Sequence, residues 1–236
     1  MPRPAVDLTS AGVLAALNEL RREPLHERVY LELREALLRG AFEPGQKLPI
    51  RVIARALNTS EVPVREALRR LTSERALEIM PNGTAAVHVM TRQKFASITT
   101  VRIALEGLAA ELAAANATDA DIAAIEKYCA ETERLEPEID RQLKPYLQAN
   151  QGFHFAIYAA GKNEELLQQI AMLWLRIGPF LNHVASYIVA RPDPWHREAT
   201  DAIRRGDARA ARAAIEGDIR DGERQLSQYA NLADDD

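Results

Sequence analysis

Apolar residues recur at steps of three and four positions along most of this chain, which is the period of an amphipathic α-helix. Between residues 51 and 71 the period predicts two short helices, whose inner faces are Ile53, Ala54, Leu57, Val64, Leu68 and Leu71. The turn between them holds Asn58, which tolerates the left-handed backbone of a helix end, and Ser60, a preferred N-cap. Pro63 falls in the first turn of the second helix, where its missing N–H costs little. The pair is typical of a helix-turn-helix, whose second helix enters the DNA major groove.

A strand signal follows this helical pair directly. Residues 77–80 and 86–89 are short β-prone runs around the turn sequence Pro81-Asn82-Gly83-Thr84, which predicts a hairpin. Any antiparallel helix pair in a helical protein has the same apolar period, so the pair alone leaves plain packing open. A hairpin placed behind the pair indicates a winged helix.

The remaining periodic segments predict a helical domain. They are residues 25–39, 91–115, 117–135, 145–160, 164–177, 179–190, 195–205 and 207–232. We expect Pro137, Gly161, the Gly178-Pro179 pair and Gly206 to separate neighbouring helices. The expected fold class is therefore mainly α, with a winged helix-turn-helix and a small β-hairpin wing over residues 25–90 and an all-α bundle over 91–232. Residues 1–24 form an extension, in which 8–22 have a helical pattern, and 233–236 form a tail.

Composition narrows the class of protein. The hydrophobic share of 47% supports a globular core, and the net charge of −4 means that a DNA-binding face requires local clustering of basic residues. The single cysteine, Cys129, excludes an internal disulfide and a Cys-rich zinc module. No apolar run approaches the roughly 18 residues of a membrane span. The N-terminus lacks the apolar core of a signal peptide, so we expect a cytoplasmic protein without a membrane partner.

Residues 25–71 resemble the N-terminal domain of the GntR family of bacterial transcription regulators. The resemblance is carried by the leading helix, by the G-x-F-x-P-G-x-x-L link from Gly40 to Leu48, and by the sequence P-V-R-E-A-L-R-R-L from Pro63 to Leu71. The opening of the second domain, Val101-Arg102 with Leu105-Glu106, is similar to the FCD-type effector domain of the FadR subfamily. This resemblance implies a regulator that binds an operator in double-stranded DNA and answers to a small-molecule effector. Since a single head should bind weakly, we expect a homodimer; repression and activation are both open.

The helix-turn-helix pattern and the resemblance together indicate the DNA-binding residues. We expect them to be Arg51, Ser60, Glu61, Val62, Pro63, Arg65, Arg69, Arg70, Asn82 and Gly83. Where the family has Ser-Arg-Thr-Pro this chain has Ser60-Glu61-Val62-Pro63, so an Arg that commonly reads guanine is replaced. Glu61 can accept from a cytosine amino group, or it can simply be an acid stabilised by the helix dipole. The family's Asn-Arg-Gly wing is Asn82-Gly83-Thr84 here, which removes a basic wing tip.

Four polar residues interrupt apolar helix faces in the second domain: Asn150, His154, His196 and Asp218. Buried ionisable groups need partners, and helical bundles build metal sites from facing helices. In metal-binding members of the FadR subfamily an Asp or Asn, a Phe-His and two later histidines hold a divalent ion. Asn150, Phe153-His154 and His196 match this pattern, and Asp218 replaces the last histidine. The set suits zinc, nickel, manganese or iron. The alternative is that Asp218 pairs with the histidines or an Arg and no metal binds.

Three further residues are expected to line the effector cavity: Arg102, Arg176 and His183. Arg102 could clamp a small organic acid bidentately or pair with Glu106 four residues on. His26 and His88 are expected at the surface. An enzyme is not expected, because a metal-dependent hydrolase would have only Glu198 as a nearby base and the chain has none of the usual catalytic motifs. A helical dimerisation protein with degenerate DNA binding is the other alternative.

Overall fold

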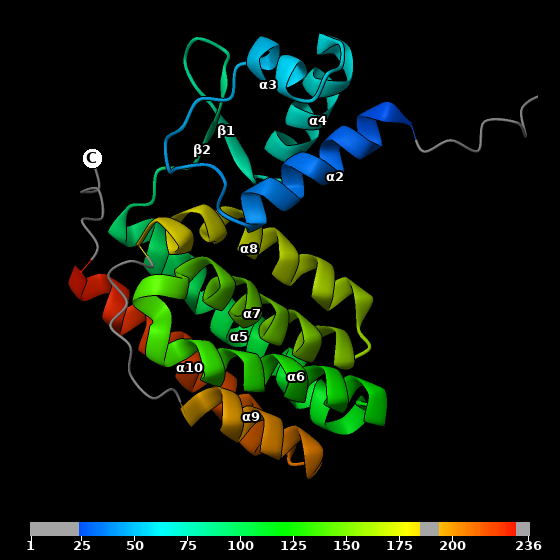
Figure 1. The fold of residues 1–236 in the computed structure, drawn as a ribbon, viewed down its shortest axis with the longest axis vertical. Coiled ribbons are helices and arrows are strands. Elements are labelled where there is room, and N and C mark those ends of the chain that lie inside the picture. Colours follow the sequence, from blue (N-terminus) through cyan, green and yellow to red (C-terminus); the bar gives the residue numbers. More distant parts are fainter. Residues whose placement is uncertain (1–23, 185–193, 230–236) are drawn as a thin grey trace, which may run out of the picture.

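The computed structural model describes residues 24–184 and 194–229, and it consists of a small head on a helical bundle (Figure 1). The predictions for the extension helix, for residues 185–190 and for the tail lie outside these residues. In the described part no helix is long and apolar enough to cross a membrane. The expected mainly-α fold class is confirmed.

The head is a winged helix-turn-helix. It comprises α2 (Leu25–Leu38), α3 (Ile50–Ala56), α4 (Glu61–Ser73), β1 (Leu77–Ile79) and β2 (Ala85–Val87). The two strands are antiparallel and pair Leu77 with Val87. The second strand thus begins one residue earlier than the sequence indicated, because the backbone at Lys47 and Leu48 also pairs with it. Asn58 has the expected left-handed backbone, with φ of 48°.

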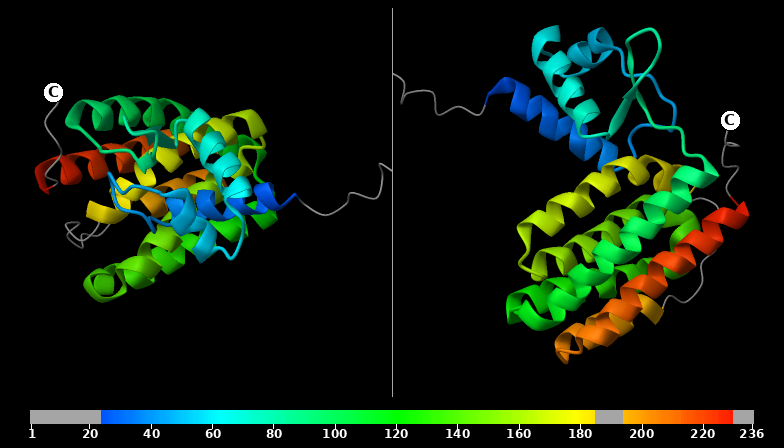
Figure 2. Two further views of the ribbon diagram at one scale, coloured as in Figure 1. Left: turned by 90° about the horizontal axis from the view of Figure 1, so that it is seen from above. Right: turned by 180° about the vertical axis from the view of Figure 1, so that it is seen from behind.

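The bundle contains the remaining helices. They are α5 (Arg92–Asn116), α6 (Asp119–Leu135), the 3-10 helix η1 (Glu136–Glu138), α7 (Ile139–Ala160), α8 (Glu164–Val184), α9 (Pro194–Arg204) and α10 (Ala208–Tyr229). Helix α5 is central and packs against α7, α8, α9 and α10; the view from behind shows α10 running along it (Figure 2). Thr91 caps α5 and Thr118 caps α6 with a capping box, as a threonine before an apolar-periodic run predicts.

Of the two predicted helix breaks at prolines, one is absent and the other is present. Helix α8 continues through Gly178 and Pro179 to Val184, so the predicted break there is wrong. Ile177 and Phe180 are both buried on either side of the proline, and this packing holds the helix together despite the lost backbone hydrogen bond. Pro137, by contrast, does interrupt the helix: it lies in η1, and Gln142 just beyond has non-helical φ and ψ of −121° and 32°.

The head rests directly on the bundle, with α2 lying across α8 (Figure 1). Two glycines make this approach possible. A Cβ on Gly178 would lie 3.5 Å from the carbonyl oxygens of Leu37 and Leu38, and a Cβ on Gly40 would lie 2.2 Å from Cβ of Asn182. The cores of the two parts are therefore continuous through α2 and α8, and a movement of α8 reaches the head directly.

Candidate functional site

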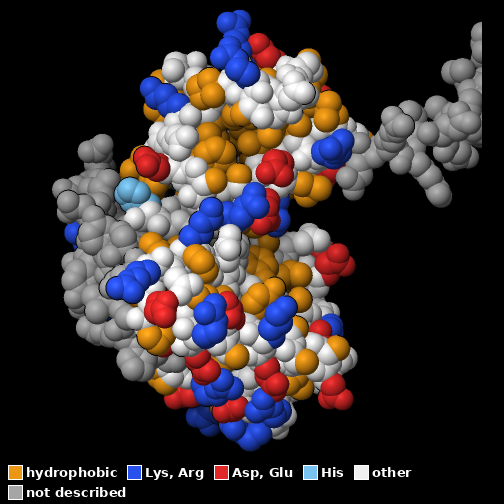
Figure 3. Space-filling view, in the orientation of Figure 1, with side chains coloured by type: hydrophobic (Ala, Val, Ile, Leu, Met, Phe, Trp, Pro, Cys, Tyr) orange, Lys and Arg blue, Asp and Glu red, His pale blue; other side chains and the backbone are white. Residues whose placement is uncertain are grey.

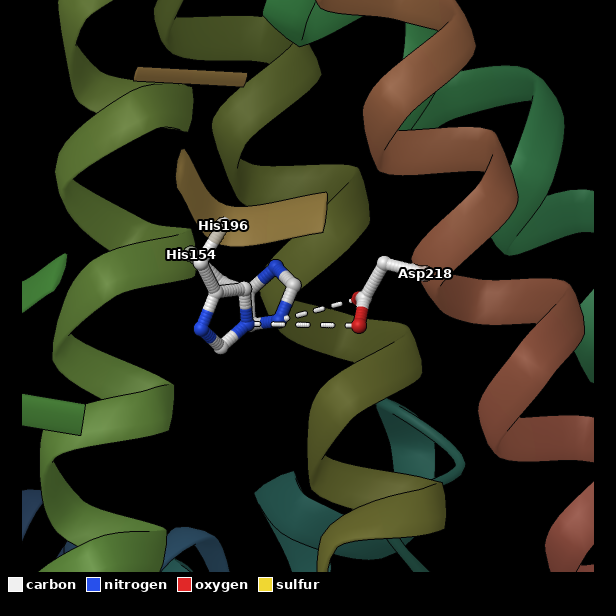
Figure 4. Close-up of side chains that lie close together, drawn as sticks. All are labelled: His154, His196 and Asp218. Atoms are coloured by element: carbon white, nitrogen blue, oxygen red, sulfur yellow. Dashed lines mark ion pairs between the residues drawn. The ribbon is translucent and has the colours of Figure 1, made fainter. Parts of the chain in front are cut away.

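Three side chains from three helices converge inside the bundle (Figure 4). His154 comes from α7, His196 from α9 and Asp218 from α10. Both histidines are 2% exposed. Their Nε2 atoms lie 3.3 Å and 3.9 Å from the two carboxylate oxygens of Asp218, and one ligand atom from each residue lies within 4.8 Å of the others. The structure thus brings together three of the four residues that were predicted to bind metal.

The tautomer of His196 is fixed by Thr132. The Thr132 hydroxyl donates to the carbonyl oxygen of Cys129 at 2.8 Å and lies 3.2 Å from Nδ1 of His196. Because the hydroxyl proton is already used, Thr132 accepts from Nδ1–H of His196. The Nε2 atom then carries a lone pair, and it faces Asp218.

The same arrangement fixes His154. The Tyr158 hydroxyl donates to the buried carboxylate of Glu106 and lies 3.1 Å from Nδ1 of His154. Burial, and then the charge of Glu106, raise the pKa of Tyr158 well above its ordinary value, so the phenol keeps its proton. Tyr158 therefore accepts from Nδ1–H of His154, and the Nε2 lone pair again faces Asp218.

Two imidazole lone pairs and a carboxylate therefore point at one small volume. Burial, followed by the charges of His196 and Arg102, lowers the pKa of His154 well below its ordinary value. A second proton on this ring, which would let Nε2 donate to Asp218, is therefore disfavoured. Two oriented imidazoles and a carboxylate are a donor set for a first-row divalent ion, and the hydroxyls on Nδ1 orient the rings as the outer partners of metal-bound histidines do. The residues present fit a metal.

His154 and Asp218 border a cavity of about 150 Å³ that is also lined by Arg102, Asn150 and Trp174. Arg102 is bound to Glu106, with nitrogen–oxygen distances of 2.6 Å and 3.2 Å. Burial alone would lower the pKa of Arg102, but the charge and hydrogen bond of Glu106 raise it above the ordinary value. The intrahelical pair considered for Arg102 is thus present, and the same residue still borders the cavity.

Arg176 and His183 do not belong to this cavity. Both lie on α8, but Arg176 lines a separate cavity beside the wing and His183 is exposed near the helix end. Their predicted place in the effector cavity is wrong, because helical periodicity places a residue on a face of α8 without showing which neighbour covers that face.

The predicted DNA-binding face lies on the end of the head far from the bundle, where basic side chains have an acidic one beside them (Figure 3). Glu61 opens α4 and is 3.2 Å from Arg51 and 3.7 Å from Arg65, whose side chains are 86% and 65% exposed. Arg69 is exposed as well. Val62 is 64% exposed, which suits contact with a thymine methyl group. Glu61 thus offsets the charge of two of the cations expected to meet phosphates.

Three members of the predicted DNA-binding set have other surroundings. Arg70 bonds to Glu27 at 2.7 Å and lies over the ring of Tyr30 at 3.6 Å, so it ties α4 to α2. Pro63 is buried and cannot reach a base edge. Ser60 is the N-cap residue of α4, but its side chain makes no capping hydrogen bond. Arg70 and Pro63 are thus engaged in the packing of the head itself.

The wing tip consists of exposed, uncharged residues. Asn82 accepts from the backbone N–H of Thr84 at 3.1 Å, and Gly83 has a φ of +80° with no neighbouring atom within 4 Å of a Cβ. His88, expected at the surface, is instead half-buried beside Glu78, at 3.2 Å. His26 is half exposed, as expected.

Sequence reasoning missed the residues that orient the histidines. Tyr158 lies four residues after His154 on the same helix face, a spacing that could have indicated it. Thr132 has no such local signal, because its contact with His196 joins residues 64 positions apart.

Comparison with known proteins identifies both parts of the chain. The family model described as bacterial regulatory proteins, gntR family, matches residues 25–87, and the FCD domain model matches residues 97–221. The chain is 30% identical to the HTH-type transcriptional regulator McbR of Escherichia coli over 71% of this chain and 75% of that protein. It is 28% identical to the HTH-type transcriptional repressor GlaR of Escherichia coli over 59% of this chain and 64% of that protein.

A solved structure gives the same result. Escherichia coli McbR/YncC superposes with a TM-score of 0.79 at 26% identity, and the match covers 89% of this chain and 100% of the other. The winged head, the helical bundle and these matches agree with one another. The chain therefore belongs to the GntR family, in the group with an FCD domain, and is a DNA-binding transcription regulator rather than an enzyme.

Proposed function

We propose that this regulator binds a two-fold operator as a homodimer, and that a divalent metal ion and a small organic acid in the central cavity control its affinity for that operator. The observation that carries the proposal is the convergence of two hydroxyl-oriented imidazoles on Asp218. His154, His196 and Asp218 would hold the ion, with the amide oxygen of Asn150 as a further ligand. The ion would supply positive charge and open coordination positions to the cavity.

The charges of the residues that line the cavity support a model in which the metal ion binds before the organic acid. Its described acidic lining residues are Glu136, Asp218, Asp221 and Glu223, whereas Arg102 is the one Lys or Arg among the described lining residues. The charge of Arg102 is already offset by Glu106. Carboxylates thus outnumber Lys and Arg among the described lining residues, and a cation bound beside Asp218 would favour the entry of an organic acid, so we expect the affinity of the acid to depend on the metal.

The contacts of α8 supply a path from the cavity to the head. Trp174 and Leu181 on α8 line the cavity, and Phe180 on the same helix packs edge-on against Phe95 of α5, with ring centroids 5.2 Å apart. Helix α8 also packs against α2, at Gly178. An effector that prefers one position of α8 would shift the population of head positions, and hence the fit of two heads to two half-sites.

The experiment is fluorescence anisotropy with DNA from upstream of the protein's own gene and with scrambled DNA of the same composition. We expect selective, salt-sensitive binding that a panel of organic acids changes only when a divalent ion is present. Equal binding to both DNAs would contradict operator recognition. An acid response that persists after chelation would contradict the metal-dependent effector.

Degenerate DNA binding is the second candidate, and the ion pairs of Glu61 with Arg51 and Arg65 favour it. In that case both DNAs would bind equally weakly, and the chain would act through the bundle alone. The same titration separates the two candidates.

A further inference from the structure

A second cavity lies between the wing and the bundle. Its volume is about 260 Å³, and it is lined by Glu78, His88, Met90, Lys94, Ile98 and Arg176, none of which borders the central cavity. Glu78 and His88 belong to the wing, Lys94 and Ile98 to the first turns of α5, and Arg176 to α8. In Figure 1 the wing stands above this end of the bundle. An occupant of the cavity would touch the head and the effector domain at once.

Arg176 is the unusual residue in this wall. Its Nε atom is buried and makes no hydrogen bond in the described part of the chain. A buried donor left without an acceptor is unfavourable, and more so when it is charged. Burial, and then the neighbouring Arg75, lower the pKa of Arg176 below its ordinary value, so a bound anion beside the guanidinium would stabilise its charged form.

Glu78, the acidic residue that lines this cavity, does not accept a hydrogen bond from Nε of Arg176. The carboxylate of Glu78 lies 3.2 Å from Nδ1 of His88, whose Nε2 is held by the carbonyl oxygen of Arg75 at 2.9 Å. Glu78 thus has a partner on its own side of the cavity. Lys94 adds a second cation on the α5 side, and Met90 and Ile98 supply buried apolar wall that strengthens charge interactions.

We propose that this cavity binds a small oxoanion, a phosphate or a carboxylate, which accepts hydrogen bonds from the guanidinium of Arg176 and the ammonium of Lys94. The planar guanidinium matches two oxygens of either group. The bound anion would tie the wing to α5 and α8. It would act as a second input to head position, separate from the metal and organic acid of the central cavity and additional to the proposed function.

Isothermal titration of the full-length protein with inorganic phosphate, and separately with succinate, tests this site without DNA. Sodium chloride at equal ionic strength is the blank. We expect saturable binding of one of the two anions at one per chain. Arg176→Gln should weaken it roughly tenfold or more, the loss of a charged hydrogen bond, whereas Arg176→Lys should retain part of it. Arg209→Gln, which removes an exposed guanidinium from α10, is the matched control and should change nothing.

Two further measurements keep the result decisive. His154→Ala should leave this binding intact, because the central cavity is separate. The anion-free Arg176→Gln protein should unfold at a temperature no lower than the wild type, since the substitution removes the buried Nε donor, which bonds to none of the described residues. No saturable binding of either anion, unchanged binding in Arg176→Gln, loss of binding in His154→Ala, or a large drop in the unfolding temperature of Arg176→Gln would each overturn the proposal.

Discussion

Replacing Glu61 by Gln removes one negative charge from the end of α4 and leaves the side-chain shape nearly unchanged. Glu61 now lies 3.2 Å from Arg51 and 3.7 Å from Arg65, so both guanidiniums are partly neutralised where DNA is expected to approach. The two arginines are well exposed, and exposed ion pairs contribute only about 0–1 kcal/mol to stability. Folding should therefore change little, and the effect should appear in DNA binding.

The size of that effect follows from Coulomb's law. A unit charge about 7 Å from a phosphate contributes about 0.6 kcal/mol in bulk water, so one or two nearby phosphates correspond to a roughly three- to tenfold gain in affinity. Each arginine released to contact a phosphate adds up to about 0.9 to the slope of log affinity against log salt. We expect Glu61→Gln to bind scrambled DNA more tightly and with a steeper salt dependence than the wild type.

Glu66→Gln is the matched control for this measurement. Glu66 lies on the same helix, is exposed, and pairs only loosely with His26 at 3.7 Å. Anisotropy titrations at several salt concentrations compare the two variants. Equal affinities of Glu61→Gln and Glu66→Gln for scrambled DNA would refute the view that Glu61 holds back phosphate binding. If Glu61 reads a cytosine, Glu61→Gln should also lose preference for the operator while it gains general affinity.

Three other predictions concern the cavity and the interface between head and bundle. Tyr158→Phe removes the acceptor of Nδ1–H on His154 and should lower divalent-metal affinity about 10- to 100-fold in a chelator competition, whereas unchanged affinity would mean that the ring needs no such support. The lowered pKa of His154 means that the unfolded chain binds more protons, so metal-free stability should fall as pH drops below the ordinary histidine value of 6.5. Thermal melts should show this fall for the wild type and a flatter profile for His154→Gln. Gly40→Ala and Gly83→Ala both place a side chain at positive φ, but only the first meets Asn182, at 2.2 Å. Gly40→Ala should therefore lower the unfolding temperature more, and equal losses would show that the head does not rest on α8 as described.

Much of the fold could be predicted because its signals are local. The apolar period, Asn58 at the helix-turn-helix bend and the caps Thr91 and Thr118 depend on neighbours a few residues away. The predicted helix break at Gly178-Pro179 was wrong for the same reason. The local signal for a break was outweighed by burial on both sides of the proline, which only the packed structure shows.

The candidate site also has one part that local signals predict and another part that only the packed structure shows. The inward faces of His154, His196 and Asp218 followed from helical spacing and a family resemblance, and their convergence is seen in the structure. The position of Arg176 could not be predicted, because it depends on how the wing lies over α5 and α8.

Control of this regulator through the bundle depends most on a cation site formed by His154, His196 and Asp218. The direct measurement is titration of Zn²⁺, Ni²⁺ and Mn²⁺ into chelator-treated full-length protein and its His154→Ala variant, with His183→Ala, an exposed histidine outside the cavity, as control. We expect one tight site per chain for at least one of these ions, lost in His154→Ala and kept in His183→Ala. No tight site in the wild type, or the same site in His154→Ala, would contradict this expectation.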